Sequence, residues 1–299
     1  TVGMSGFTRA GEAKAVPLAL VKQAHSNPLK ITLITGASLG NDLDKQLTEA
    51  GVLARRLPFQ VDNTLRKAIN KGEVMFIDQH LSETVEQMRN LQLKKPDVAI
   101  IEAVAITEDG GIIPTTSVGN SASFAIFAEK VIVEINTNLS PAFEGLHDIY
   151  IPTYRPTRQA IPLTQVDERI GTHAINIDPS KIAGIVFNSE YHDSPSTVTE
   201  PDDETQGIAN HLINFFEQEV AEGRLPKDLG PLQAGIGSIA NAVLTGLKES
   251  NFEDLVMYSE VLQDCTFELI DAGKMKFASG SSITLSAKYG EKVFNNKPS

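Results

Sequence analysis

The chain has 299 residues and carries 26 Lys and Arg against 38 Asp and Glu, a formal net charge of −12 at pH 7. That balance argues against binding nucleic acid or an anionic membrane through bulk charge. The single cysteine, Cys265, excludes an internal disulfide framework and indicates a reducing compartment. The longest apolar stretch, residues 98–106, is interrupted by Glu102 and is too short to span a bilayer. The length suggests roughly two domains of about 150 residues each.

The first part of the chain alternates short β-branched apolar runs with helical patterns. The apolar runs predict buried strands at residues 31–35, 74–77, 98–101, 131–135 and 182–187. Apolar spacing predicts helices over 43–50, around 65–69 with an end at 72, and over 81–88. Asn41 and Asp42 are expected to cap the first of these helices. The segment 108–111 predicts a hairpin, and 136–158 a long ordered loop.

A breaker-rich stretch at residues 189–201 predicts a boundary. An amphipathic helix is expected from Asp202 or Asp203 to Gly223, with an acidic N-terminus formed by Glu200, Asp202, Asp203 and Glu204. A helix around 239–243, a strand over 255–258 and a helix over 265–271 follow. The pattern predicts an α/β protein with mostly parallel strands in two domains, of which the second is short.

The first short motif of interest is Gly36-Ala37-Ser38-Leu39-Gly40, which matches the nucleophile-elbow pattern between a strand and a helix. A serine hydrolase would also need an acid and a histidine further along the chain. Histidines are available, but none stands in a diagnostic loop. The motif therefore leaves three alternatives: a serine nucleophile at Ser38, a turn that faces a ligand, and a purely structural turn.

The second motif, residues 235–240, matches the dinucleotide fingerprint with alanine in its last position. The preceding segment 229–233 is a poor strand because Pro231 lacks a donor N–H, which weighs against a nicotinamide cofactor. Gly235 and Gly237 would still let the backbone approach an oxyanion or carboxylate at a helix start.

Glu260 stands near the end of a predicted strand, where ligands bind in open α/β sheets. By itself such a glutamate is more often a surface or capping residue. The six histidines and one cysteine form no metal-ligand spacing, so we expect no metal site.

Taken together, the motifs resemble the acetyl-CoA hydrolase/transferase family, which includes succinyl-CoA:acetate CoA-transferases. The resemblance covers nearly the whole chain. It rests on residues 1–8, 35–38, 66–70, 78–82, 101–103, 108–115, 117–121, 232–243 and 259–264.

The resemblance implies two CoA-transferase-like (NagB/RpiA-type) open-sheet domains, a homodimer, and coenzyme A thioesters as substrates with no tightly bound cofactor. It assigns Glu260 as the nucleophile that forms an acyl-glutamyl anhydride and then a glutamyl-CoA thioester. The backbone N–H of Ile236, between Gly235 and Gly237, becomes the oxyanion donor. Ser38 and Asn120 become substrate-binding residues, which leaves Ser38 as a wall of the site rather than its nucleophile.

The chain departs from the family pattern in the linker 190–204. Members with succinate specificity carry an arginine there, whereas this linker has none and Ser194 stands at the aligned position. That difference favours a smaller acid, such as acetate or propionate, or water as the acceptor, with succinate left as an alternative.

Family members begin upstream of Thr1 and continue beyond Ser299 into a segment with a second oxyanion donor. We therefore expect a part of a longer protein, and a non-catalytic fragment of the CoA-transferase stays an alternative to an active enzyme. The expected division is an N-terminal domain over 1–190, a linker over 191–201, and the start of a C-terminal domain over 202–299. A cytoplasmic location, or the mitochondrial matrix in a eukaryote, is the corresponding expectation.

Overall fold

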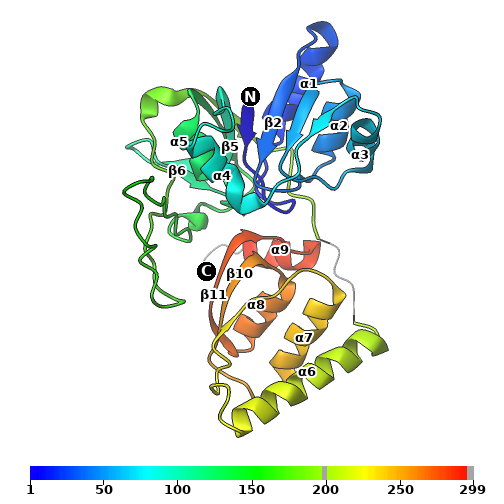
Figure 1. Ribbon diagram of the computed structural model, residues 1–299, viewed down its shortest axis with the longest axis vertical. Helices are drawn as coiled ribbons and strands as arrows, with labels where there is room; N and C mark the ends of the chain where they lie inside the picture. The colour runs from blue at the N-terminus through cyan, green and yellow to red at the C-terminus, as the bar shows by residue number, and fades with distance from the viewer. Residues whose placement is uncertain (197–200, 295–299) are drawn as a thin grey trace. The chain divides into compact units, whose positions relative to one another are not determined.

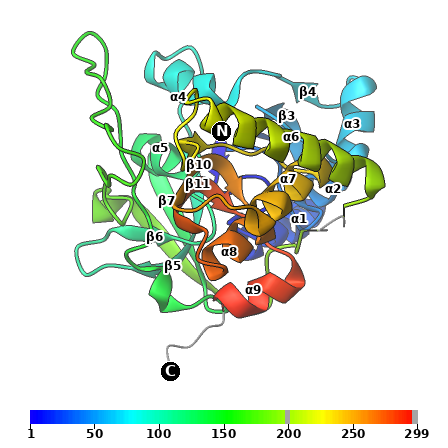
Figure 2. The same cartoon turned by 90° about the horizontal axis from the view of Figure 1, so that it is seen from below.

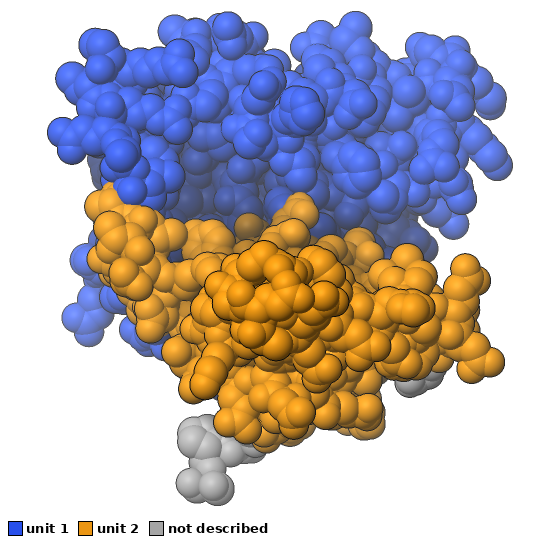
Figure 3. Space-filling model, turned by 60° about the horizontal axis from the view of Figure 1, so that its bottom comes forward, with its two compact units in different colours: residues 1–161, 170–194, 294–299 blue, residues 162–169, 195–293 orange. Residues whose placement is uncertain are grey.

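Residues 1–196 and 201–294 are described by a computed structural model, shown as a ribbon in Figure 1. They divide into two compact units, coloured separately in Figure 3. Unit 1 contains residues 1–161, 170–194 and 294, and unit 2 contains residues 162–169, 195–196 and 201–293. In this part of the chain no helix combines the length and the apolar character needed to cross a membrane.

Unit 1 is built on a parallel sheet in the order β4-β3-β2-β1-β5-β7-β8, with β6 added antiparallel to β5. Its strands are β1 (Val2–Met4), β2 (Ile31–Thr35), β3 (Leu53–Leu57), β4 (Met75–Phe76), β5 (Val98–Ile106), β6 (Ile112–Pro114), β7 (Lys130–Asn136) and β8 (Ile182–Asn188). Its helices are α1 (Ala15–Ser26), α2 (Leu43–Glu49), α3 (Asn63–Asn70), α4 (Leu81–Arg89) and α5 (Ser121–Phe127), with short 3-10 turns at Pro141–Phe143 and Pro179–Lys181.

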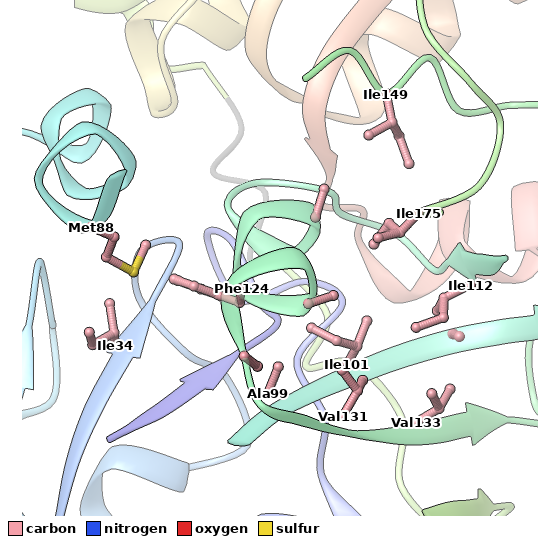
Figure 4. Close-up of a cluster of buried hydrophobic side chains, with 14 of the residues drawn as sticks. Ile34, Met88, Ala99, Ile101, Ile112, Phe124, Val131, Val133, Ile149 and Ile175 are labelled. Carbon is pink, nitrogen blue, oxygen red and sulfur yellow. The ribbon is translucent and has the colours of Figure 1, made fainter. Parts of the chain in front are cut away.

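Both faces of this sheet are buried, because successive side chains of a strand point to opposite sides. Ile34 of β2 and Ile101 of β5 belong to a cluster with Phe124 of α5 and Met88 of α4, drawn in Figure 4. Their neighbours Leu33 and Ile100 instead join a second cluster that includes residues of α1, α2 and α3. The apolar strand runs of the sequence therefore reflect a sheet with helices on both faces.

Most elements expected in unit 1 are confirmed, including the antiparallel pairing of β5 with β6 across residues 107–111. Strand β5 is longer than expected and β4 is shorter. The expected N-cap position of α2 is confirmed at Asp42, which has a left-handed φ of 53°, but the Asp42 side chain makes no capping hydrogen bond. The Asn41 side chain instead donates to Glu12 at 2.9 Å.

Unit 2 has a three-stranded parallel sheet in the order β11-β10-β9. Its strands are β9 (Pro231–Leu232), β10 (Leu255–Leu262) and β11 (Met275–Ile283), and its helices are α6 (Asp203–Ala221), α7 (Ser238–Glu249), α8 (Asp264–Asp271) and α9 (Ala287–Phe294). Helices α6 and α7 lie side by side in both Figure 1 and Figure 2. The core beneath them includes Leu244, Leu255 and Leu269.

The acidic start of α6 is confirmed for the described residues. Asp202 and Thr205 form a reciprocal capping box, and Asp203 and Glu204 occupy the first turn, where negative charge favours a helix. Glu200 lies outside the described residues. The helix expected over 265–271 is also confirmed as α8, whereas β11 was not expected from the sequence.

Candidate active site

Glu260 lies on β10, two residues before the C-terminal end of a strand that the sequence analysis had ended at Tyr258. Tyr258 and Glu260 are exposed on one face of the strand, whereas Ser259 and Val261 are buried on the other. The strand alternation thus presents the Glu260 carboxylate to solvent while its neighbours fix the backbone in the core.

The glycine loop, defined here as residues 233–237, connects β9 to α7. Strand β9 pairs with β10 through Pro231, so the expectation that 229–233 would be a poor strand holds only in part. Pro231 is tolerated because β9 is an edge strand of the described sheet. Gly237 is the N-cap of α7 with a φ of 120°, a conformation that favours glycine.

Ile236 projects from this loop with 67% of its surface exposed. Across residues 1–196 and 201–294 its backbone N–H donates no hydrogen bond. A Cβ added at Gly235 or Gly237 would meet no heavy atom within 4 Å, so packing does not hold the loop in place. The loop therefore offers a free backbone donor in an open setting.

Two side chains that flank Glu260 hold the glycine loop. Ser259 Oγ donates to the carbonyl oxygen of Ala234 at 2.9 Å, and it lies 3.4 Å from the Ala234 N–H as its acceptor. Gln263 Nε2 donates to the carbonyl oxygen of Gly235 at 3.3 Å. The structure thus brings together Glu260 and the loop of Gly235, Ile236 and Gly237, which are separated by more than twenty residues in sequence.

Ser38 and Asn120 belong to unit 1, in loops at the carboxyl end of its sheet. A Cβ at Gly36 would lie 2.7 Å from the Gly6 carbonyl oxygen, 3.0 Å from the Phe7 ring and 3.6 Å from the Asn120 nitrogen. The loops after β1, after β2 and before α5 therefore pack against one another. Ligands bind at such an edge in open α/β sheets, which keeps both residues as candidates.

Ser38 is buried, and its carbonyl oxygen accepts the Arg9 N–H at 3.0 Å. No hydrogen bond joins Ser38 to a histidine in the part of the chain that the structure describes. The hydrogen bonds of Ser38 in the described residues therefore give no support to the serine-nucleophile alternative, which needs an adjacent base.

The turn beside Ser38 was missed by the sequence analysis. Phe7 and Ala10 exchange backbone hydrogen bonds of 3.0 and 3.2 Å, which forces Thr8 and Arg9 to positive φ values of 51° and 65°. This conformation is unusual for a β-branched residue, and tight two-residue turns normally carry Asn or Gly. Nothing in the residue types therefore signalled the turn. Backbone strain of this kind concentrates at functional sites.

A buried charge cluster, formed by Lys14, Glu102, Asp193 and Glu12, lies inside unit 1. Lys14 Nζ lies 2.6 Å from Glu102 Oε2 and 2.7 Å from Asp193 Oδ1. Asp193 Oδ2 also accepts from the Gly11 N–H at 3.2 Å and the Thr116 hydroxyl at 2.6 Å. These contacts fasten the linker residue Asp193 to unit 1.

The cluster contains three carboxyl groups and one lysine. Burial raises the pKa of Glu102 to about 8, and burial also raises the pKa of Glu12. Burial alone would lower the pKa of Lys14, but the surrounding carboxylates, Glu102 foremost, raise it. The sequence signal was a carboxyl inside an apolar run, since Glu102 interrupts β5.

Ser194, the linker position where succinate-specific relatives were expected to differ, is engaged with unit 1. Its Oγ accepts the Asn41 N–H at 3.0 Å. A hydroxyl at this position therefore fixes the linker and supplies no positive charge. In the described residues no three His, Cys, Asp or Glu side chains converge as a metal site would require.

Residues 1–187 match the acetyl-CoA hydrolase/transferase N-terminal domain. The chain is 45% identical over 285 residues to a succinyl-CoA:acetate CoA-transferase of Clostridium kluyveri, covering 95% of this chain and 53% of that protein. It is 44% identical over 305 residues to an acetyl-CoA hydrolase of Schizosaccharomyces pombe, covering 99% of this chain and 58% of that protein. The chain thus spans a little over half the length of these relatives.

Solved structures share the fold at lower identity. RipA from Yersinia pestis gives a TM-score of 0.67 at 18% identity, covering 100% of this chain and 63% of that chain. A 4-hydroxybutyrate CoA-transferase from Porphyromonas gingivalis gives 0.58 at 20% identity, covering 99% and 61%. The expected α/β fold with an open parallel sheet is confirmed. From the matched domain and the relatives above 40% identity, the chain belongs to the acetyl-CoA hydrolase/transferase family.

Proposed function

We propose that this chain contributes the nucleophile of an acyl-CoA:carboxylate CoA-transferase or acetyl-CoA hydrolase, with Glu260 in that role. The observation that carries the proposal is the exposed Glu260 carboxylate on β10, flanked by the two side chains that hold the glycine loop. Family membership supplies the substrate class, coenzyme A thioesters.

In the first half of the reaction the Glu260 carboxylate attacks the thioester carbonyl. The C–S bond breaks, and an acyl-glutamyl anhydride and the CoA thiolate form. The thiolate then attacks the glutamyl carbonyl of the anhydride. A carboxylate product leaves, and a glutamyl-CoA thioester remains on the enzyme.

In the second half an acceptor carboxylate attacks the glutamyl thioester and re-forms an anhydride with release of the thiolate. The thiolate attacks the acyl carbonyl, which yields the new acyl-CoA and regenerates Glu260. Water in place of the acceptor hydrolyses the thioester to Glu260 and free CoA. Transfer and hydrolysis therefore share one covalent enzyme form.

Each attack passes through a tetrahedral oxyanion, which needs hydrogen-bond donors. The free N–H of Ile236, on the loop held beside Glu260, supports its assignment as one donor. Ser38 and Asn120, at the carboxyl edge of the unit 1 sheet, are proposed to line the substrate site. Coenzyme A acts as a substrate in this scheme, with no tightly bound cofactor.

The proposed acceptor is a small acid such as acetate or propionate, or water. Ser194 supplies a hydroxyl that is already engaged with Asn41, where a succinate-binding arginine would bring positive charge. We further propose a homodimer in the cytoplasm, or in the mitochondrial matrix of a eukaryote. Its domains would be residues 1–190 and a second domain beginning at 202, joined by the linker 191–201.

The test is covalent trapping of Glu260. After incubation with acetyl-CoA, mass spectrometry of peptides should find a CoA thioester on Glu260, and Glu260→Gln should abolish both the adduct and acyl exchange. Glu249→Gln, an exposed carboxyl on α7, is the matched control and should retain the adduct.

Full turnover in Glu260→Gln would contradict the mechanism. Loss of turnover in Ser38→Ala, together with labelling of Ser38 by a fluorophosphonate, would instead support a serine hydrolase. A wild-type protein with neither turnover nor adduct would contradict catalysis by this chain.

A further inference from the structure

The Gly235–Ile236 peptide unit is held from one side only. Its carbonyl oxygen accepts the hydrogen bond from Gln263 Nε2 at 3.3 Å, and its N–H is the free donor described above. The peptide is trans, because the cis bonds of the described chain are those before Pro58 and Pro156. In a planar trans peptide the C=O and N–H point in opposite directions, so a partner that fixes one fixes the other.

From this geometry we propose that Gln263 is a positioning residue that sets the direction of the Ile236 N–H, an inference that rests on the proposed function. Gln263 would act through the peptide plane and would not touch the substrate. A hydrogen bond to the carbonyl also polarises the peptide, which strengthens the N–H at the other end as a donor.

The loop needs such a restraint because neither packing nor residue type provides it. Gly235 and Gly237 flank Ile236 and allow wide φ ranges, and neither has a neighbour within 4 Å of an added Cβ. The Ser259 contacts end one peptide earlier, at Ala234. Without Gln263 the Gly235–Ile236 peptide could rotate while Ser259 still held the base of the loop.

The placement of Gln263 fits this role. It is the N-cap of α8, directly after β10, and its backbone is fixed by that strand and by the helix. It lies three residues beyond Glu260, on the same strand end. One short segment therefore carries the proposed nucleophile and the group that orients the proposed donor. The sequence spacing of Glu260 and Gln263 does not by itself predict the contact with the glycine loop, which depends on the pairing of β9 with β10.

The test is Gln263→Met, which keeps the length of the side chain but cannot donate. In the ¹⁵N-labelled chain, the backbone order parameter of the Ile236 N–H should fall from the rigid value of about 0.85 to about 0.6 or below. That of the Gly235 N–H should not fall, because it belongs to the Ala234–Gly235 peptide, which Ser259 still holds. With acetyl-CoA, kcat should fall about 10- to 100-fold while KM changes less than about 3-fold, because the donor acts mainly in the transition state. Gln218→Met on α6 is the matched control and should leave both readouts unchanged.

A second variant, Gln263→Glu, distinguishes a hydrogen-bonding role of residue 263 from a role in packing alone. Its carboxyl can donate to the Gly235 carbonyl only when protonated, so the ratio of its kcat to that of Gln263→Met should rise as the pH falls toward about 4–5. A simple packing role predicts a constant ratio.

The outcomes distinguish this inference from the proposed function. Wild-type kcat in Gln263→Met, with Glu260→Gln inactive, would overturn the role of Gln263 and leave Glu260 as nucleophile. An unchanged order parameter of the Ile236 N–H in Gln263→Met would also overturn the positioning role of Gln263. Full turnover in Glu260→Gln would show that no oxyanion forms by attack of Glu260. The proposed function and the role of Gln263 would then both be wrong.

Discussion

Replacing Glu102 by glutamine tests whether the buried charge cluster of unit 1 takes up a proton on folding. Glu102 is fully buried on β5 and faces Lys14, Asp193 and Glu12, with Glu134 beside it on β7. Glutamine keeps the size of the side chain and its capacity to accept from the Thr115 hydroxyl, which now donates to Oε1 at 2.7 Å. The amide NH2 of the glutamine then faces Lys14 Nζ, which now lies 2.6 Å from Oε2, so the variant loses stability at every pH. The test is therefore the pH dependence of the stability difference rather than its size.

The raised pKa of Glu102 determines whether stability rises or falls with pH. An unfolded glutamate has a pKa of 4.5, whereas burial raises the pKa of Glu102 to about 8 in the folded chain. Between these values the folded chain keeps a proton that the unfolded chain releases. The free energy of unfolding should therefore fall as pH rises, by at most about 1.4 kcal/mol per pH unit from this group. From pH 5 to pH 8 the upper bound is about 4 kcal/mol. Lys14, whose pKa is raised, contributes no slope in this window.

In Glu102→Gln this slope disappears, so the stability of the variant relative to wild type should improve steadily from pH 5 to pH 8. Urea dependence of hydrogen exchange at the β5 amides, corrected for intrinsic exchange, reports the unfolding free energy of this unit. Glu49→Gln, which removes an exposed carboxylate on α2, is the control for the effect of the lost negative charge on stability. A stability difference that stays constant within about 0.5 kcal/mol across the range would refute the reasoning, because Glu102 would then be ionised throughout.

Two further substitutions test the packing of unit 1. In Gly3→Ala the new Cβ would lie 2.8 Å from Cγ of Phe124, so unfolding should become easier by about 1–3 kcal/mol, and Phe124→Leu in that background should recover part of the loss. Wild-type thermal stability in Gly3→Ala would show that the strand can shift. Arg56→Met should cost about 3–5 kcal/mol in urea unfolding, because it leaves the buried Asp44 carboxylate without its partner at 2.8 Å. Adding Asp44→Asn to Arg56→Met should restore part of the lost stability. If the losses of the two single variants instead add in the double variant, the pairing of Arg56 with Asp44 is contradicted.

The sequence was sufficient for elements whose residues carry a strong local pattern. Strands β2, β7 and β8 are β-branched runs, and α6 has both an apolar face and a capping box. Two of the missed elements, β1 and β11, lack such a pattern. Strand β1 has three residues, one of them glycine, and gains its place from pairing with β2 and β5. Strand β11 contains a polar stretch at 279–282 and is defined by its pairing with β10.

The candidate site was predictable only in its residue types. Glu260 and the glycine loop followed from the family resemblance, but their joining through Ser259 and Gln263 depends on the register of β9 against β10. That register could not be predicted, because Pro231 and a two-residue strand give almost no local signal. The partners of Lys14 could not be predicted either, because Asp193 follows it by 179 residues and contacts it only through tertiary folding.

The two units hold their polar groups in different ways, and the difference bears on catalysis. In unit 1 the buried cations Lys14 and Arg56 pair with the carboxylates of Asp193 and Asp44, which makes removal of one partner costly. In unit 2 Glu260 is exposed, and three side-chain hydrogen bonds to backbone, each worth about 1 kcal/mol, hold the loop beside it. An exposed carboxylate is well hydrated and is a poor nucleophile until water is displaced. On the proposed mechanism the bound thioester must therefore supply that desolvation, while Ser259 and Gln263 keep the donor in place before it arrives.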